Sequence, residues 1–181
     1  MEVKVEKLNY TYKGKKLLRD LSFSISSKHI VGLTGKYKSL VCEILDLTKP
    51  YQGEIFFDGE KIEKDNIRKF QQMVALISQE DLFFMDTVEE EMNFIVENYQ
   101  YTSRDLKKRM LDALKLVGLA DSFLHRKLET LSKSERMLIK VACAFLVNPK
   151  VILFDESFCY LSHNHKRVVL SLIQKMKERK D

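Results

Sequence analysis

The chain has 181 residues, of which 45% are hydrophobic and 31% charged, a composition typical of a globular chain with one sizeable core. Its net charge is +5, but basic and acidic residues alternate in 103–117 and 163–181, which is typical of solvated helix faces. The longest apolar runs, such as 151–154, are too short to span a membrane, and the N-terminus MEVKVEKLNY lacks the pattern of a secretory signal. We therefore expect a cytoplasmic domain that neither crosses a membrane nor binds nucleic acid.

Two residue types are informative by their number. Cys42, Cys143 and Cys159 are widely spaced within apolar stretches, so we expect buried free thiols and neither a disulfide framework nor a metal knuckle. The chain has only six glycines, about half the usual share of roughly 7%. This shortage bears on any loop that must bring backbone amides close to phosphate.

The N-terminal third of the chain has the patterns of strands followed by one helix. Residues 2–9 and 20–26 alternate apolar and polar side chains, which predicts two half-buried strands with a bend at 12–14. The run 30–33 is short, apolar and β-branched, as in a buried strand of a parallel sheet. Apolar residues in 38–47 recur every three or four positions, which predicts a helix.

The remaining two thirds have a long helical block between strands. Residues 53–57 and 73–78 are predicted as strands, and Asp58-Gly59 is the turn after the first of them. From 87 to 148 the periodicity is helical throughout, which predicts a helical subdomain. Residues 151–154 are the last predicted strand, and a helix follows it.

A candidate phosphate loop lies at the start of the first predicted helix. The sequence Gly32-Leu33-Thr34-Gly35-Lys36-Tyr37-Lys38-Ser39 has the layout of strand, glycine turn and helix with Lys-Ser at its start. Backbone N–H groups, a lysine and a hydroxyl are the groups that bind phosphate and Mg²⁺ in such loops. The loop is three residues shorter than the usual motif and lacks its second glycine, so the pattern alone also fits a plain strand-to-helix turn.

Two adjacent carboxylates follow the last predicted strand, in the sequence VILFDES of residues 151–157. Asp155 is suited to orient Mg²⁺ or its waters, and Glu156 to polarise an attacking water as general base. Acidic residues also end strands for ordinary capping reasons. The Lys-Ser helix upstream favours the functional interpretation.

The stretch LSKSERMLIKVACAFLVNPKVILFDES, residues 131–157, resembles the ATP-binding cassette (ABC) family, in which a signature LSGGQ, a helix, an Asn-Pro turn and an acidic strand follow in this order. Tyr12 and Gln79 stand where the family has its adenine-stacking aromatic and its Q-loop glutamine. Residues 87–119 further resemble the helical subdomain of energy-coupling-factor type ATPases.

The resemblance implies a single α/β domain over residues 1–181, built on a P-loop NTPase (RecA-like) core. Residues 1–86 and 149–181 would form this core with an N-terminal antiparallel β subdomain, and 87–148 the inserted helical subdomain. The chain ends before the family's last strands and switch histidine, so we expect these elements to be missing; His163 and His165 are expected to be surface residues.

The resemblance also implies ATP and Mg²⁺ as cofactors and assigns the site residue by residue. Nucleotide contacts are assigned to Tyr12, Gly35, Lys36, Tyr37, Lys38, Ser39, Leu40 and Ser132. Metal contacts are assigned to Ser39, Gln79 and Asp155, and catalysis to Glu156 and Gln79. The implied partners are a second ABC ATPase subunit, in a homodimer or heterodimer, and a transmembrane transporter subunit, which would place the chain on the inner face of the membrane.

The departures from the family pattern lie in elements that contact the γ-phosphate in the family. Lys133 and Ser134 replace the two signature glycines and Glu135 replaces the glutamine, while 159–162 lacks the aspartate of the family's D-loop. Losing convergent donors costs on the order of 10² to 10³ in rate per donor. We therefore expect an ATP-binding transporter subunit with reduced or no hydrolysis. The alternatives are a non-catalytic scaffold or regulatory partner of a competent ATPase and, from the positive charge alone, a nucleic-acid binder.

Overall fold

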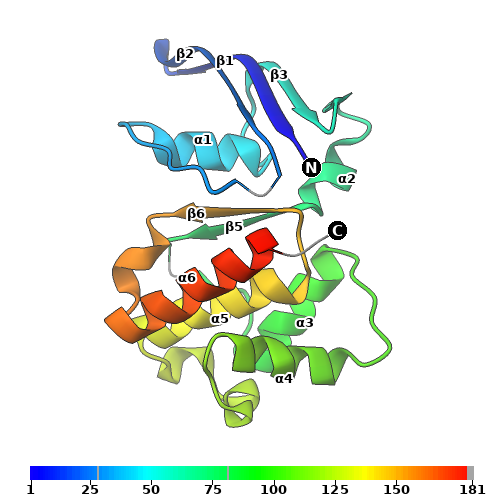
Figure 1. Cartoon of the computed structure of the whole chain (residues 1–181), viewed down its shortest axis with the longest axis vertical. Helices are drawn as coiled ribbons and strands as arrows, with labels where there is room; N and C mark the ends of the chain where they lie inside the picture. The colour runs from blue at the N-terminus through cyan, green and yellow to red at the C-terminus, as the bar shows by residue number, and fades with distance from the viewer. Residues whose placement is uncertain (28, 81, 179–181) are drawn as a thin grey trace.

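The computed structural model describes residues 1–27, 29–80 and 82–178, and its first layer is a four-stranded antiparallel sheet (Figure 1). Its strands are β1 (Val3–Tyr12), β2 (Lys15–Ile25), β3 (Gln52–Phe57) and β4 (Glu60–Lys61), in the order β2-β1-β3-β4. Both N-terminal strands were predicted and are longer than the sequence pattern indicated. The predicted turn between β3 and β4 is formed by Asp58 and Gly59, which both have positive φ angles of 49° and 79°, as tight hairpins require.

Gly53 allows β3 to approach β1 at a bulge. Its φ is +108°, and an added Cβ would lie 2.5 Å from the backbone oxygen of Lys7, which itself has a φ of 48°. A side chain at position 53 would therefore be excluded by both its backbone conformation and the neighbouring strand.

The second sheet has two parallel strands, β5 (Val74–Ser78) and β6 (Val151–Asp155), in the described part of the chain. They pair in register from Val74↔Val151 to Ser78↔Asp155, so their carboxyl ends meet at one edge. Figure 1 shows α1 (Lys38–Leu45) between the two sheets. Among the described residues no strand follows β6.

The remaining helices lie mostly on the far side of β5 and β6 from α1 (Figure 1). They are α3 (Val88–Asn98), α4 (Leu106–Leu116), α5 (Lys133–Leu146) and α6 (His163–Glu178), with the 3-10 turns η1 (Asp121–His125), η2 (Leu128–Thr130) and η3 (Ser157–Tyr160), while the short α2 (Ile67–Gln71) precedes β5. No helix of the described residues is both long enough and apolar enough to cross a membrane. The predicted helical block is thus confirmed as secondary structure, and its boundaries as a subdomain stay a prediction.

The β5–β6 sheet separates two hydrophobic cores. Ala75 and Ile77 face the cluster formed by α3, α4, α5 and α6, whereas Val74 and Leu153 belong to the cluster of β1, β3 and α1. This division follows from the pleat, because successive side chains of a strand point to opposite faces. Both faces are covered, as expected for parallel strands rich in Val, Ile and Leu.

One predicted strand is absent. Residues 30–33 form no strand, and Ile30 and Val31 are 62% and 49% exposed. The loop that follows is three residues short, which removes about 10 Å of reach between this segment and α1. Since α1 is bonded to the end of β6, the short loop gives a physical reason why the segment does not pair with β6.

A second correction concerns the cysteines. Cys42 and Cys143 are buried free thiols as predicted, but Cys159 is exposed. Burial raises the pKa of Cys42 to about 11 and that of Cys143 to about 12, so both stay protonated thiols at neutral pH. Cys159 lies in η3, a surface turn that its apolar neighbours did not reveal.

Candidate functional site

The candidate site lies where the start of α1 meets the carboxyl ends of β5 and β6. Ser39, in the first turn of α1, donates a hydrogen bond of 2.8 Å from its Oγ to Oδ1 of Asp155, the last residue of β6. Asp155 is buried, at 8% exposure, and the two residues are 116 positions apart in the sequence. The fold therefore brings together the hydroxyl and the carboxylate that the sequence predicted as metal ligands.

Lys38 and Glu156 form a second contact beside the first. The Nζ of Lys38 lies 2.6 Å from Oε1 of Glu156. The hydrogen bond to Glu156 and then its negative charge raise the pKa of Lys38 above its ordinary value. The ammonium group is therefore fully charged at neutral pH and held by the residue predicted to act as general base.

The backbone of Glu156 has an unusual conformation for a residue with a side chain. Its φ is 51° and its ψ is 9°, in the left-handed region, and it forms an isolated bridge with Ser78 at the end of β5. Such conformations cost on the order of 1 kcal/mol and persist where the surrounding structure imposes them. The next residue, Ser157, has a buried Oγ with no hydrogen-bond partner among the described residues.

The loop before α1 is open. Gly35 has a φ of +128°, and no heavy atom would lie within 4 Å of a Cβ added to it, so glycine is needed there for its backbone and not for space. The Nζ of Lys36 lies 5.6 Å from the centre of the Tyr37 ring, and Tyr37 occupies the N-cap of α1 without a side-chain capping bond. Tyr37 and Leu40 pack against the core around α1.

Tyr12, the predicted adenine-stacking residue, ends β1 and is 53% exposed. The Nζ of Lys13 lies 5.4 Å from the centre of its ring. An exposed aromatic face at the end of a strand is available for stacking on a flat ligand. Its use in nucleotide binding stays a prediction.

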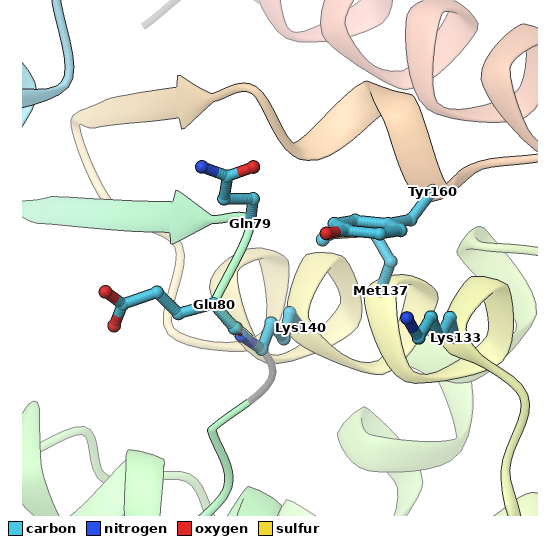
Figure 2. A pocket seen from close by; sticks show the side chains of 6 residues that line it. All are labelled: Gln79, Glu80, Lys133, Met137, Lys140 and Tyr160. Carbon is cyan, nitrogen blue, oxygen red and sulfur yellow. Dashed lines mark hydrogen bonds between the residues drawn. The ribbon is translucent and has the colours of Figure 1, made fainter.

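Gln79 follows β5 directly and lines a small pocket (Figure 2). Figure 2 shows its amide at the end of β5, with the Tyr160 ring lying over α5 beside Met137 and Lys133. The pocket is lined by Gln79, Glu80, Lys133, Met137, Lys140 and Tyr160. Because Ser78 pairs with Asp155, the backbone of Gln79 is one residue from the Ser39–Asp155 contact.

Ser132 is the N-cap of α5. Its side chain accepts a hydrogen bond from the backbone N–H of Glu135, whose carboxylate in turn accepts one from the N–H of Ser132. This backbone bond, followed by the Ser132 hydroxyl and then Arg126, lowers the pKa of Glu135. Ser132 therefore has a structural role in the chain itself, in addition to the predicted nucleotide contact.

The substituted positions of the signature stretch contact the region that follows β6. The Nζ of Lys133 lies 5.6 Å from the centre of the Tyr160 ring, and Oγ of Ser134 lies 2.8 Å from Nδ1 of His165. His165 is half-buried, which corrects the expectation of a surface histidine, whereas His163 is exposed as predicted. Sequence analysis assigned no role to Tyr160, although 159–162 was recognised as the stretch where the family has its D-loop, and His165 was named only as an expected surface residue.

Mg²⁺ fits the oxygen donors at Ser39 and Asp155. Magnesium prefers oxygen ligands and usually keeps several waters or phosphate oxygens, so one hydroxyl and one carboxylate from the protein suffice. Gln79 is near these two residues through the β5–β6 pairing. Its assignment to the metal stays a prediction.

A fold with a helix entered from a glycine turn, meeting acidic residues at the carboxyl ends of parallel strands, defines the class of P-loop nucleotide-binding domains. The family model for the ABC transporter matches residues 18–159. The chain belongs to this family, which confirms the resemblance and the fold class expected from the sequence.

The curated relatives include ATP-binding proteins of energy-coupling factor transporters. One from Mycoplasma mobile is 31% identical over 184 residues, covering 98% of this chain and 67% of that protein, and one from Enterococcus faecium is 29% identical, covering 97% and 66%. The chain spans between 58% and 67% of the length of such relatives.

Solved structures show the same fold. The ATP-binding cassette MJ0796, solved as a dimer bound to ADP and Pi, aligns with a TM-score of 0.86 at 22% identity, covering 97% of this chain and 83% of that one. An ATP-binding subunit of an ABC transporter aligns with a TM-score of 0.86 at 21% identity, covering 98% and 75%.

Proposed function

We propose that this chain is the ATP-binding subunit of an ABC transporter and links nucleotide binding to transport across a membrane. The observation that supports this most is the convergence of Lys38 and Ser39 with Asp155 and Glu156 at one edge of the β5–β6 sheet. These are the lysine, hydroxyl and carboxylates that phosphoryl-transfer sites of this class require. The relatives named as transporter ATP-binding proteins favour the same role.

In this proposal each residue has a defined task. Lys38 binds the terminal phosphates, and Ser39 and Asp155 hold Mg²⁺, which neutralises phosphate charge when bound. Tyr12 stacks on the base, and Gly35, Lys36, Tyr37 and Leu40 shape the loop around the phosphates. Glu156 orients the attacking water, and Gln79 senses the γ-phosphate at the end of β5.

We further propose that hydrolysis by this chain alone is slow or absent. The loop before Lys38 is three residues short, so fewer backbone amides can point at a phosphate. In the signature stretch, Lys133 and Ser134 replace the glycines that would let the γ-phosphate of a nucleotide bound to a partner subunit approach the backbone. A more competent second ATPase subunit, a transmembrane subunit and a peripheral position on the inner face of the membrane belong to the same proposal.

The second candidate is a non-catalytic scaffold or regulatory partner of a competent ATPase. The ion pair of Lys38 with Glu156 favours it, because the lysine that would bind phosphate is already neutralised. The two candidates differ in one property, since a scaffold binds its protein partner without binding Mg-ATP.

Calorimetric titration of the full chain with Mg-ATP separates the two candidates. Saturable binding that Lys38→Ala abolishes is the result expected for an ATP-binding subunit. Lys4→Ala is the matched control, because Lys4 also forms an exposed ion pair of 2.6 Å, with Glu6, far along the chain from the site. An unchanged affinity in Lys38→Ala would overturn the site assignment, and no binding up to millimolar ATP would favour the scaffold.

A further inference from the structure

Lys38 and Ser39, the side chains proposed to bind the phosphates and the metal, are already bound to carboxylates of the protein itself. Lys38 Nζ lies 2.6 Å from Glu156, and Ser39 Oγ donates to Asp155 at 2.8 Å. These two contacts fasten the first turn of α1 to the end of β6. A polyphosphate that enters the loop must therefore exchange with a group that is already bound.

Glu156 is held in this position by its backbone as well as by its side chain. The residue has a left-handed φ of 51° and bridges Ser78 on β5. A non-glycine residue keeps this conformation only where its surroundings over-determine it. The fold therefore fixes the backbone from which the Glu156 carboxylate reaches Lys38, and the two partly exposed side chains meet there at 2.6 Å.

The other lysine of the loop is directed elsewhere. Lys36 points its ammonium group toward the Tyr37 ring, with the nitrogen 5.6 Å from the ring centre. Two anions that compete for one ammonium group also repel each other at close range. The affinity of the loop for phosphate is therefore lowered by whatever free energy the Lys38–Glu156 pair contributes.

We propose that Glu156 is a built-in competitor of the nucleotide, whose carboxylate holds Lys38 in the empty site and is displaced by the terminal phosphates of a nucleoside polyphosphate. This inference rests on the proposed function. Displacement frees the side chain of Glu156, whose backbone bridges Ser78, the residue before Gln79.

The test measures nucleotide affinity after the competing charge is removed. Glu156→Gln keeps the size of the side chain and deletes its charge, and titrations of the full chain with Mg-ATP and Mg-ADP should give dissociation constants about 3- to 5-fold lower, the scale of an exposed ion pair. ADP has no γ-phosphate, so a tightening seen with ADP cannot result from blocked hydrolysis. Glu60→Gln is the matched control, since Glu60 forms an ion pair of 2.6 Å with Lys69 away from the site and loses the same charge.

The titrations have three possible outcomes. Tightening in Glu156→Gln but not in Glu60→Gln supports the competitor. If both variants tighten equally, or if Glu156→Gln binds like the wild type or more weakly, the inference is wrong while the chain remains a nucleotide-binding subunit. If neither the wild type nor Glu156→Gln binds any nucleotide, both the inference and the proposed function fall.

A second variant guards against misfolding. Glu156→Asp keeps the charge but shortens the side chain by one methylene, which withdraws the carboxylate from Lys38. Its affinity should lie between those of the wild type and Glu156→Gln. An affinity weaker than that of the wild type, in a variant with an unchanged circular dichroism spectrum, would show that the carboxylate assists binding and would overturn the inference.

Discussion

Asp46, at the C-cap of α1, is an acid that is mostly buried, and burial raises its pKa from 3.8 to about 7. The folded state therefore binds a proton that the unfolded state has lost between about pH 4 and pH 7. The contribution of Asp46 to the free energy of unfolding therefore falls as the pH rises through that window, by an amount on the order of a few kcal/mol.

Asp46→Asn should flatten this pH dependence. Urea denaturation at pH 5 and pH 8 should show a smaller loss of stability in the variant than in the wild type. Asp112→Asn, at an exposed position on α4, is the control and should leave the pH dependence unchanged. Equal losses in the wild type and Asp46→Asn would contradict the assignment.

Glu91 on α3 is a buried carboxylate, at 4% exposure, that accepts hydrogen bonds from the backbone N–H groups of Phe84 and Met85 at 2.9 and 3.0 Å. It thus anchors the backbone of Phe84 and Met85, shortly before α3. Glu91→Ala should lower the free energy of unfolding by about 1–3 kcal/mol, because two N–H groups lose their acceptor. Amide exchange at Phe84 and Met85 should accelerate, whereas Glu97→Ala, at an exposed site on the same helix, should leave it unchanged.

The sequence predicted the members of the candidate site but not how they pair. Lys38, Ser39, Asp155 and Glu156 were identified from their order along the chain, and the structure brings all four together. The ion pair of Lys38 with Glu156 joins residues that lie far apart in the sequence, and no local pattern indicates the left-handed backbone of Glu156. The contact of Ser134 with His165 depends on how α5 and α6 pack, and side-chain pairs between distant segments are not encoded by spacing.

The helices α3 and α5 share one device, a reciprocal capping box at the N-terminus. Thr87 with Glu90 and Ser132 with Glu135 each satisfy two backbone donors. Ser132→Ala should therefore destabilise the chain by about 1 kcal/mol. Guanidinium denaturation measures this change, and Ser171→Ala, at an exposed position within α6, should not show such a loss. A stability of Ser132→Ala equal to that of the wild type would show that the cap is not formed in solution.

Elements were predictable where periodicity and turn residues agreed. The strands β1, β2, β3, β5 and β6 and the helical block follow from alternation, apolar runs and the Asp58-Gly59 turn, whereas the two-residue β4 was not predicted. The predicted strand at 30–33 was wrong because composition indicates the strand preference of a segment, but not whether its connections are long enough to place it beside a neighbouring strand. The short loop before α1, visible in the sequence, weakens the connection that would seat this segment beside β6.

At the scale of the whole molecule, the fold class was predicted from the resemblance of residues 131–157 to the ABC family. The two cores share the β5–β6 sheet, so residues on opposite faces of β5 stabilise different layers. This arrangement could not be read from the apolar pattern alone, because a fully apolar strand does not show which neighbour covers each face.

The edge of β6 that faces away from β5 has no strand partner among the described residues. The β-branched side chains of Ile30 and Val31, in the segment before α1, are also exposed. Unpaired strand edges and exposed β-branched residues favour association between chains. We therefore expect the molecular mass in sedimentation equilibrium to rise with protein concentration. Val31→Lys should reduce this rise, because a charge on the exposed β-branched segment opposes association. Leu170→Lys, at an apolar residue of α6 with 50% exposure, should not. A chain that stays strictly monomeric up to the highest concentration reached would contradict this expectation. An equal effect of both lysine variants would show that association depends on net charge and not on the exposed β-branched segment.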